Sequence, residues 1–273
     1  MGTAAKAILF RLTAFLALWG TLLAPLTVPI IRKYEAAEAL DRPFSRLVLE
    51  SLSLVSTILA VAMVMWLFDR RSFASIGFLR GTSFQHMLLG LGLGAGMVGL
   101  TLAILRLTGH LELGSRGRPI WWPLLVMISA VLLNAITQQV MVRYVQVTVA
   151  EFISPLAGLV VSALVFSALH LGATRGAPLA SFNLLLAGVL LGYSYLSTQD
   201  LWLPIAVHFS WNALWGPVLG LTVSGRSLSS GWQLVRLTGS ETVTGGSFGV
   251  EGGVAATIAT IWGLLLVFLR YGY

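Results

Sequence analysis

The sequence lacks cysteine and has few charged residues. Without Cys, the chain can form no disulfide bond, thiol nucleophile or thiolate metal site. Only 10% of its 273 residues are charged, whereas a soluble domain carries about 25%. So few charges cannot cover a water-facing surface, and 57% of the residues are hydrophobic. The composition therefore predicts a membrane protein.

Basic residues outnumber acidic ones without forming a cluster. The 17 Lys and Arg residues are scattered over connections and helix ends, and the net charge is +7. A nucleic-acid site would concentrate such charges in a run or patch. Basic residues beside spanning helices are instead typical of contacts with anionic lipid. We therefore expect membrane lipid as a partner and no nucleic acid.

Long apolar stretches predict an all-α, polytopic bundle of about eight transmembrane helices. A spanning helix needs about 20 predominantly apolar residues. The first stretch is expected to be an uncleaved span, because its apolar run reaches Ile31 without a clear small-x-small cleavage site. The expected spans are 8–31, 46–68, 84–107, 121–145, 153–172, 179–197, 201–221 and 250–270.

The spans suggest a division into N-terminal transmembrane helices, 1–115, and a region that holds the site, 116–273. In the third span, the pairs Gly90/Gly94 and Gly92/Gly96 have the spacing that allows two helix backbones to approach closely. The longest connection, 222–249, is rich in Gly and Ser. It is either a flap over a site or a linker.

Polar and ionisable side chains within the spans indicate where a site lies, because such groups are costly in hydrocarbon. Gln139 and Arg143 are four residues apart and share a helix face, and so do His208 and Asn212. Such faces can converge on one pocket in a bundle core, or they can serve as interhelical hydrogen bonds. The polar residues at membrane depth are Asn134, Gln138, Gln139, Arg143, His170, Asn183, His208 and Asn212.

Metal and serine chemistry are poorly supported in these spans. Two His supply two ligands, whereas zinc takes three or four from protein, and no carboxylate lies near the middle of these helices. Ser167 and Ser210 neighbour His170 and His208, but no Asp or Glu is close in sequence to complete a triad. We therefore expect no cofactor, and a divalent metal is disfavoured.

Three short segments resemble the motifs of the CPBP, or Abi, family of intramembrane endopeptidases. That family carries Glu-Glu-x-x-x-Arg, then Phe-x-x-x-His, then His-x-x-x-Asn or Asp on successive core helices. This chain has Gln138-Gln139-x-x-x-Arg143, Phe166-x-x-x-His170 and His208-x-x-x-Asn212 in the same order. The tail from Gly216 to Gly253 also resembles bacterial members, so the resemblance covers about 120–270.

The resemblance implies a role for each matching residue. In the family, the first Glu activates the water that attacks a peptide carbonyl. By resemblance, His170 assists this water, His208 and Asn212 stabilise the oxyanion, and Arg143 braces the first helix. A peptide or membrane-protein substrate is implied, together with a multi-pass location in the bacterial cytoplasmic membrane.

The departure from the family pattern falls on the decisive position. Gln138 and Gln139 replace both Glu residues, and a Gln side chain cannot accept a proton at neutral pH. A positioned general base typically contributes ~10²–10⁴-fold to the rate. The sequence therefore predicts a CPBP/CAAX-type endopeptidase scaffold that is impaired or inactive as it stands.

Other interpretations remain open at this stage. The first is a non-catalytic membrane-binding or immunity-type protein, and the second is a working peptidase with His170 as base, since imidazole titrates near neutral pH. The third is an engineered Glu→Gln exchange. Tyr144 argues for natural divergence instead, because the family usually has Gly at that position. A transporter is disfavoured, since no inverted repeat is evident.

Overall fold

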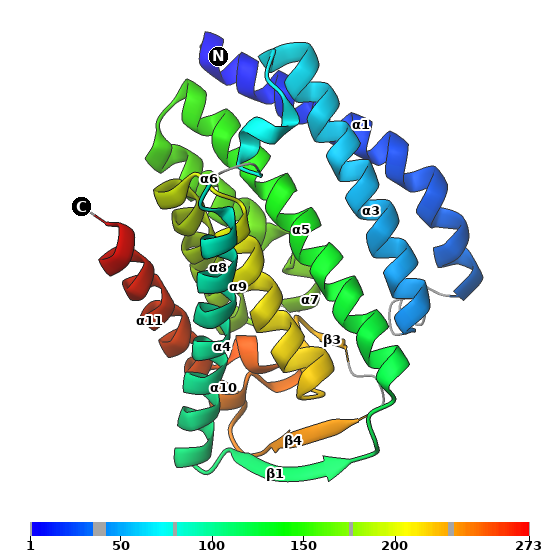
Figure 1. The fold of residues 1–273 in the computed structure, drawn as a ribbon, viewed down its shortest axis with the longest axis vertical. Coiled ribbons are helices and arrows are strands. Elements are labelled where there is room, and N and C mark those ends of the chain that lie inside the picture. The colour runs from blue at the N-terminus through cyan, green and yellow to red at the C-terminus, as the bar shows by residue number, and fades with distance from the viewer. Residues whose placement is uncertain (1, 35–41, 79–80, 175–176, 229–231, 273) are drawn as a thin grey trace.

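The protein is an almost entirely helical bundle (Figure 1). The computed structural model describes residues 2–34, 42–78, 81–174, 177–228 and 232–272. Within these residues, six helices are long and apolar enough to cross a membrane. They are α1 (Thr3–Tyr34), α3 (Pro43–Val64, continued by a π-helical turn Met65–Asp69), α4 (Ser83–Leu107), α5 (Trp121–Phe152), α8 (Pro178–Thr198) and α11 (Val254–Tyr271). The predicted all-α membrane bundle is confirmed.

Six of the about eight expected spans have the length and apolarity of a membrane-crossing helix, and two contain shorter helices. Residues 153–172 contain α6 (Pro155–Ala168), which has 14 residues, and residues 201–221 contain α9 (Trp202–Ala213), which has 12. Ten residues of α9 are buried inside the bundle. A helix surrounded by protein is apolar on every side, just like one surrounded by lipid. Hydropathy therefore cannot separate a short buried helix from a spanning one.

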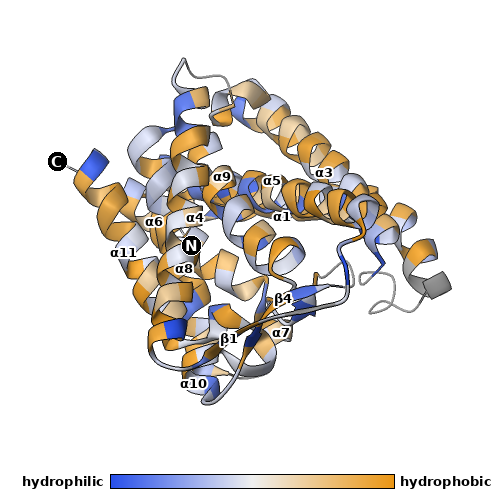
Figure 2. Cartoon of the chain, turned by 60° about the horizontal axis from the view of Figure 1, so that its bottom comes forward, coloured by the Kyte–Doolittle hydropathy of each residue, from blue (hydrophilic) through white to orange (hydrophobic). Residues whose placement is uncertain are grey.

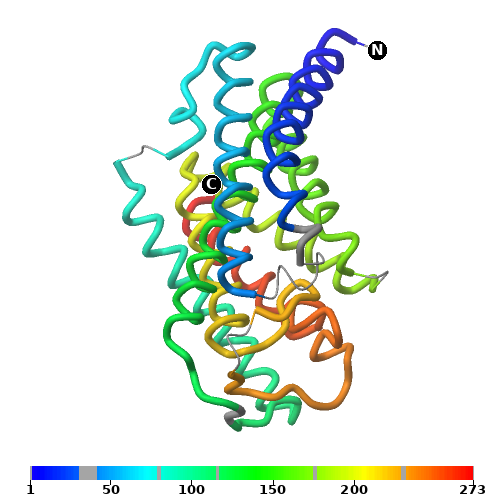
Figure 3. Tube along the Cα trace, turned by 90° about the vertical axis from the view of Figure 1, so that its right-hand side faces the viewer, coloured from blue at the N-terminus to red at the C-terminus, as the bar shows by residue number. Residues whose placement is uncertain are grey.

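Helix α5 is the centre of the bundle. It contacts α1, α3, α6, α8 and α9. Helices α1 and α3 lie side by side on one flank (Figure 3), while α4 and α11 lie on the other side of the molecule. Hydrophobic residues run along most of α1, α3 and α11 (Figure 2), as expected for helices that face lipid.

Glycines allow α4 and α9 to pack closely. A Cβ atom added at Gly90 would lie 2.6 Å from the Leu203 carbonyl oxygen, and one at Gly94 would lie 2.9 Å from that of Val207. By contrast, a Cβ atom at Gly92 would meet nothing within 4 Å. The close-packing prediction therefore holds for the pair Gly90/Gly94, and Gly92 faces outward. The backbone of α9, which carries His208 and Asn212, is set against this smooth face of α4.

The connection after α9 is folded and lies at one end of the bundle, at the bottom of Figure 1. A π-helical turn (Leu214–Val218) continues α9, and a small hairpin of β2 (Thr222–Val223) and β3 (Arg226–Ser227) follows it. Strand β4 (Gln233–Leu237) then pairs antiparallel with β1 (Leu111–Arg116). The segment continues through α10 (Glu241–Thr244) and two 3₁₀ turns (Gly246–Phe248 and Val250–Gly252) into α11. The described part of the connection 222–249 is therefore folded and is not a simple linker. The division of the chain between residues 115 and 116 stays a prediction.

The glycine face gives a matched pair of substitutions. Gly94→Ala should lower the free energy of unfolding by about 1–3 kcal/mol, the usual cost of overpacking, because its methyl group would collide with α9. Gly92→Ala adds the same methyl group to the same helix in open space and should not destabilise the protein. Thermal unfolding in detergent measures both variants. Equal melting temperatures for the two would contradict the close approach of α4 and α9.

Candidate active site

A polar cavity of about 660 Å³ opens where α3, α5, α9, the end of α6 and the β2–β3 hairpin meet. Helices that are distant in sequence supply its walls, so no single segment contains the site. The polar residues on its walls are Arg46, Glu50, Asn134, Gln138, His170, Asn212, Ser224, Arg226, Ser227 and Ser247.

A smaller, more apolar cavity of about 50 Å³ adjoins it. His170, Asn212 and Ser224 line both cavities, which are therefore two parts of one site. His208 and Glu251 lie on the wall of the smaller part. Of the six polar residues in the three family-like motifs, four thus border the combined space: Gln138, His170, His208 and Asn212.

Gln139 lies behind the site and supports it. Its side chain is completely buried and lines neither cavity. Its Nε2 lies 3.1 Å from His208 Nδ1 and joins α5 to α9. With the amide nitrogen facing the ring, Nδ1 is the acceptor, so the proton of a neutral imidazole lies on Nε2. His208 can then donate a hydrogen bond from Nε2.

His170 has the opposite arrangement. It follows the end of α6, and its Nδ1 lies 2.9 Å from the carbonyl oxygen of Phe166. Since a carbonyl oxygen only accepts, Nδ1 carries the proton, and Nε2 of the neutral ring keeps a lone pair. The Phe166 ring also packs against both imidazoles, with centroids 5.1 Å from His170 and 5.7 Å from His208. One aromatic side chain therefore orients both histidines.

Arg143 does not line the site. Its side chain is completely buried, and Nη1 donates to Gln146 Oε1. Gln146 Nε2 in turn donates to the Gly192 carbonyl oxygen at 3.0 Å, which connects α5 to α8. The guanidinium fits because residue 192 has no side chain: a Cβ atom there would lie 3.0 Å from Arg143 Nη1. Arg143 therefore lies between α5 and α8 and lines neither cavity.

Glu251 is a residue of the site that sequence reasoning did not single out. Its Oε1 accepts a hydrogen bond from Trp211 Nε1 at 3.1 Å. Its Oε2 accepts from both the backbone N and the Oγ of Ser224, at 2.6 and 2.7 Å. Because Trp211 lies on α9 and Ser224 in the hairpin, one carboxylate holds the hairpin against the site. Only its place in the Gly-rich tail motif hinted at this role.

Asn183 supports the same turn from α8. Its Nδ2 donates to the carbonyl oxygens of Glu251, at 2.7 Å, and Gly253, at 3.0 Å, and its Oδ1 accepts from Thr257. Every polar atom of the amide is thus used to hold the turn before α11. Asn183 therefore holds the backbone around Glu251, and it also lines the smaller cavity.

A second carboxylate reaches the large cavity from α3. Glu50 Oε2 accepts a hydrogen bond from Asn134 Nδ2 at 3.0 Å, and Asn134 Oδ1 accepts one from Gln138 Nε2 at 3.1 Å. Arg46 Nη2 lies 3.5 Å from Glu50 Oε1. Sequence reasoning missed Glu50 because it lies about 90 residues before the first motif, and no local spacing links the two.

The residues of the site do not fit a metal ion. Among the described residues, no three His, Asp or Glu side chains come together as ligands. The two histidines face Phe166 and Gln139 through Nδ1, and both oxygens of Glu251 are occupied by Trp211 and Ser224.

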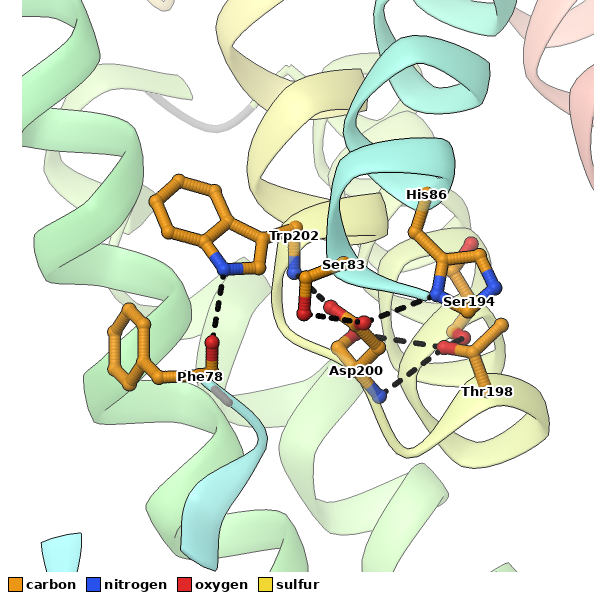
Figure 4. Close-up of polar contacts among 7 residues, drawn as sticks. All are labelled: Phe78, Ser83, His86, Ser194, Thr198, Asp200 and Trp202. Atoms are coloured by element: carbon orange, nitrogen blue, oxygen red, sulfur yellow. Dashed lines mark hydrogen bonds and ion pairs between the residues drawn. The ribbon is translucent and has the colours of Figure 1, made fainter. Parts of the chain in front are cut away.

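Another buried polar cluster lies at the opposite end of α4 from β1 (Figure 4). Asp200 is fully buried and accepts hydrogen bonds from Ser83 Oγ at 2.9 Å and from the Trp202 backbone N at 2.8 Å. His86 Nδ1 lies 3.0 Å from the same carboxylate. These bonds join the start of α4 to the turn between α8 and α9. The cluster lines neither part of the site and stabilises the packing of α4.

These features define a class of protein: a multi-pass helical membrane protein with histidine and amide groups around a polar cavity in its core. Residues 120–214 match the family described as type II CAAX prenyl endopeptidase Rce1-like. This segment includes α5, α6, α8 and α9 and all six residues singled out from the sequence. Residues 120–214 therefore form an Rce1-like region of the CPBP family, which supports a CPBP-type intramembrane protease scaffold. Searches of curated proteins and of solved structures returned no match.

The hairpin contact gives a prediction about local stability. Glu251→Gln should speed hydrogen exchange of the Ser224 amide by about 10-fold or more, because a hydrogen bond to a charged group contributes ~1.5–3 kcal/mol. Glu241→Gln, an exposed change in α10 of the same segment, should leave this exchange unaltered. Exchange read by mass spectrometry compares the two. Unchanged protection in Glu251→Gln would show that another contact holds the hairpin.

Proposed function

We propose that the protein is an endopeptidase that hydrolyses peptide bonds of peptides or membrane proteins at or in the membrane, and that its activity is impaired because Gln138 and Gln139 stand where the family has Glu. The observation that carries this proposal is the complementary state of the two histidines around one cavity. His170 offers a lone pair at Nε2, and His208 offers a proton at Nε2.

This arrangement suits acyl transfer to water. The carbonyl oxygen of a scissile peptide becomes negatively charged in the transition state and needs donors that are already in place. His208 Nε2–H and the Asn212 amide lie beside the smaller cavity and supply such donors. His170 Nε2 can hold the attacking water by accepting one of its hydrogen bonds. Peptide binding between these groups places the carbonyl against the donors and the water against its carbon.

Gln138 rather than Gln139 is the residue that lowers the activity in this proposal. Gln138 lines the large cavity with His170 and Asn212, whereas Gln139 lines neither part of the site and contacts His208 from behind. An amide at position 138 can orient water, but it cannot take its proton. We therefore assign the missing water-activating carboxylate to position 138.

The matched family supports the choice of substrate class. Its description names a prenyl endopeptidase, and we propose that this chain likewise acts on a peptide that is held at the membrane. The apolar wall of the smaller cavity, with Met97, Leu184 and Leu191, offers a subsite for an apolar group beside the scissile bond. The likeness of the tail to bacterial members favours the bacterial cytoplasmic membrane as its location. A non-catalytic binding or immunity-type role is the second candidate, favoured by the same Gln residues.

Restoring the family carboxylate tests this function. In liposomes, Gln138→Glu should raise the cleavage rate by about 10²-fold or more, because it returns a carboxylate to the position where the family has its water-activating Glu. Gln139→Glu is the matched control and should give no such gain, since position 139 does not reach the cavity. The probe is a library of farnesylated and unmodified peptides with free C-terminal carboxylates, read by mass spectrometry.

The outcomes separate the candidate functions. Equal cleavage by the original chain and by Gln138→Glu would show that Gln138 causes no impairment. Peptide binding without cleavage in every variant would favour the non-catalytic role.

A further inference from the structure

The large cavity has a carboxylate in its wall although the first motif has none. Glu50, in the second turn of α3, lines this cavity together with Gln138, His170 and Asn212. We infer that Glu50 is a catalytic residue that accepts the proton of the attacking water in place of the carboxylate missing from position 138. This inference rests on the proposed peptidase function of the same site.

The position of Glu50 relative to Gln138 is defined by two hydrogen bonds. Gln138 Nε2 donates to Asn134 Oδ1, and Asn134 Nδ2 donates to Glu50 Oε2. Asn134 lies one turn before Gln138 on α5, so it bridges the motif-one position and α3. The carboxylate in this cavity thus comes from α3, the neighbour of α5, and not from the first motif on α5.

The surroundings of Glu50 balance its charge. Its side chain is almost fully buried, and an unpaired charge at such depth would be costly. Arg46 Nη2 lies 3.5 Å from Glu50 Oε1, and Arg226 of the hairpin lines the same cavity. A buried Glu that faces a cavity and is paired in this way is an expensive feature for a purely structural helix contact.

Glu251 is less suited to the same task. Three donors from Trp211 and Ser224 occupy its two oxygens, and it lies on the smaller part of the site. To take a proton from water it would have to give up the contact that holds the hairpin. Glu50 lies on the wall of the larger part, where there is room for water.

The reaction balances with Glu50 as the acceptor. One O–H bond of the water breaks, its proton passes to the Glu50 carboxylate, and the water oxygen forms a bond to the peptide carbonyl carbon. The carbonyl π electrons move to oxygen, which His208 Nε2–H and the Asn212 amide stabilise. As the C–N bond breaks, its electron pair takes the proton back from Glu50. The products are a carboxylic acid and an amine, and the carboxylate of Glu50 is regenerated.

The test moves the carboxylate between two positions of the chain. Glu50→Gln keeps the shape and an acceptor for Asn134 but cannot take a proton. It should lower cleavage of the peptide library in liposomes by about 10²-fold or more relative to the original chain. Glu151→Gln is the matched control: Glu151 is exposed, 3.6 Å from Arg71, and should keep the original rate. The double variant Glu50→Gln/Gln138→Glu should regain activity, because it places a carboxylate on the family position.

The double variant also excludes a simple failure to fold. If Glu50→Gln loses activity and the added Gln138→Glu does not restore it, Glu50 has a structural role and the inference is wrong. If Glu50→Gln keeps the original rate while His170→Ala abolishes cleavage, His170 is the base, and the peptidase function stands without Glu50. If only variants with Gln138→Glu cleave peptide, Glu50 is likewise refuted and the scaffold is a peptidase site without a base. If no variant cleaves, the proposed function fails first, and the assignment of Glu50 falls with it.

Discussion

The hydrogen bond between Gln139 and His208 is the contact on which the site depends. It joins α5 to α9 inside the bundle, and with Nδ1 as its acceptor a neutral His208 carries the proton on Nε2. Hydrocarbon offers no alternative partners, so polar side chains at this depth must pair with one another. A membrane bundle that needs a polar pocket therefore has to build it from such pairs, and this pair aims a donor into the cavity.

The remaining contacts hold the partners of this pair in place. Gly90 and Gly94 let α4 approach the backbone of α9, so His208 and Asn212 are set by backbone packing rather than by flexible side chains. Phe166 packs on both imidazole rings. Arg143, which lies outside the cavities, connects α5 to α8 through Gln146. Residues with no access to the substrate thus determine the geometry of those that border the cavity.

Three acidic residues of the bundle differ in the hydrogen-bond partners that surround their carboxylates. Asp200 is enclosed by Ser83, His86 and the Trp202 backbone and serves packing. Glu251 is occupied by Trp211 and Ser224 and serves the hairpin. Glu50 lines the large cavity of about 660 Å³. The three carboxylates thus differ in their surroundings: three donors surround Asp200 and three surround Glu251, whereas Glu50 accepts from Asn134, pairs with Arg46 and borders the large cavity.

Much of the architecture could be predicted from sequence because it depends on local pattern. The low charge and the long apolar stretches predicted a polytopic helical membrane protein, and the spacing around Arg143, His170 and His208 predicted the family. The length of α9 could not be predicted, since a helix buried in protein and a helix buried in lipid are equally apolar. The strands β1 and β4 were also missed, because they are short and pair across more than 100 residues of sequence.

By itself, the sequence determined the class of protein, the family resemblance and the presence of Gln138 and Gln139 where the family motif has Glu, because residue identity and spacing alone carry this information. Only the tertiary structure decided which of Gln138 and Gln139 lines the cavity. Consecutive side chains point about 100° apart on a helix, so the packing of the neighbouring helices decides which of the two faces the cavity. It also decided that Glu50 reaches the site, because a contact between α3 and α5 is a property of packing and leaves no trace in the spacing of residues along the chain.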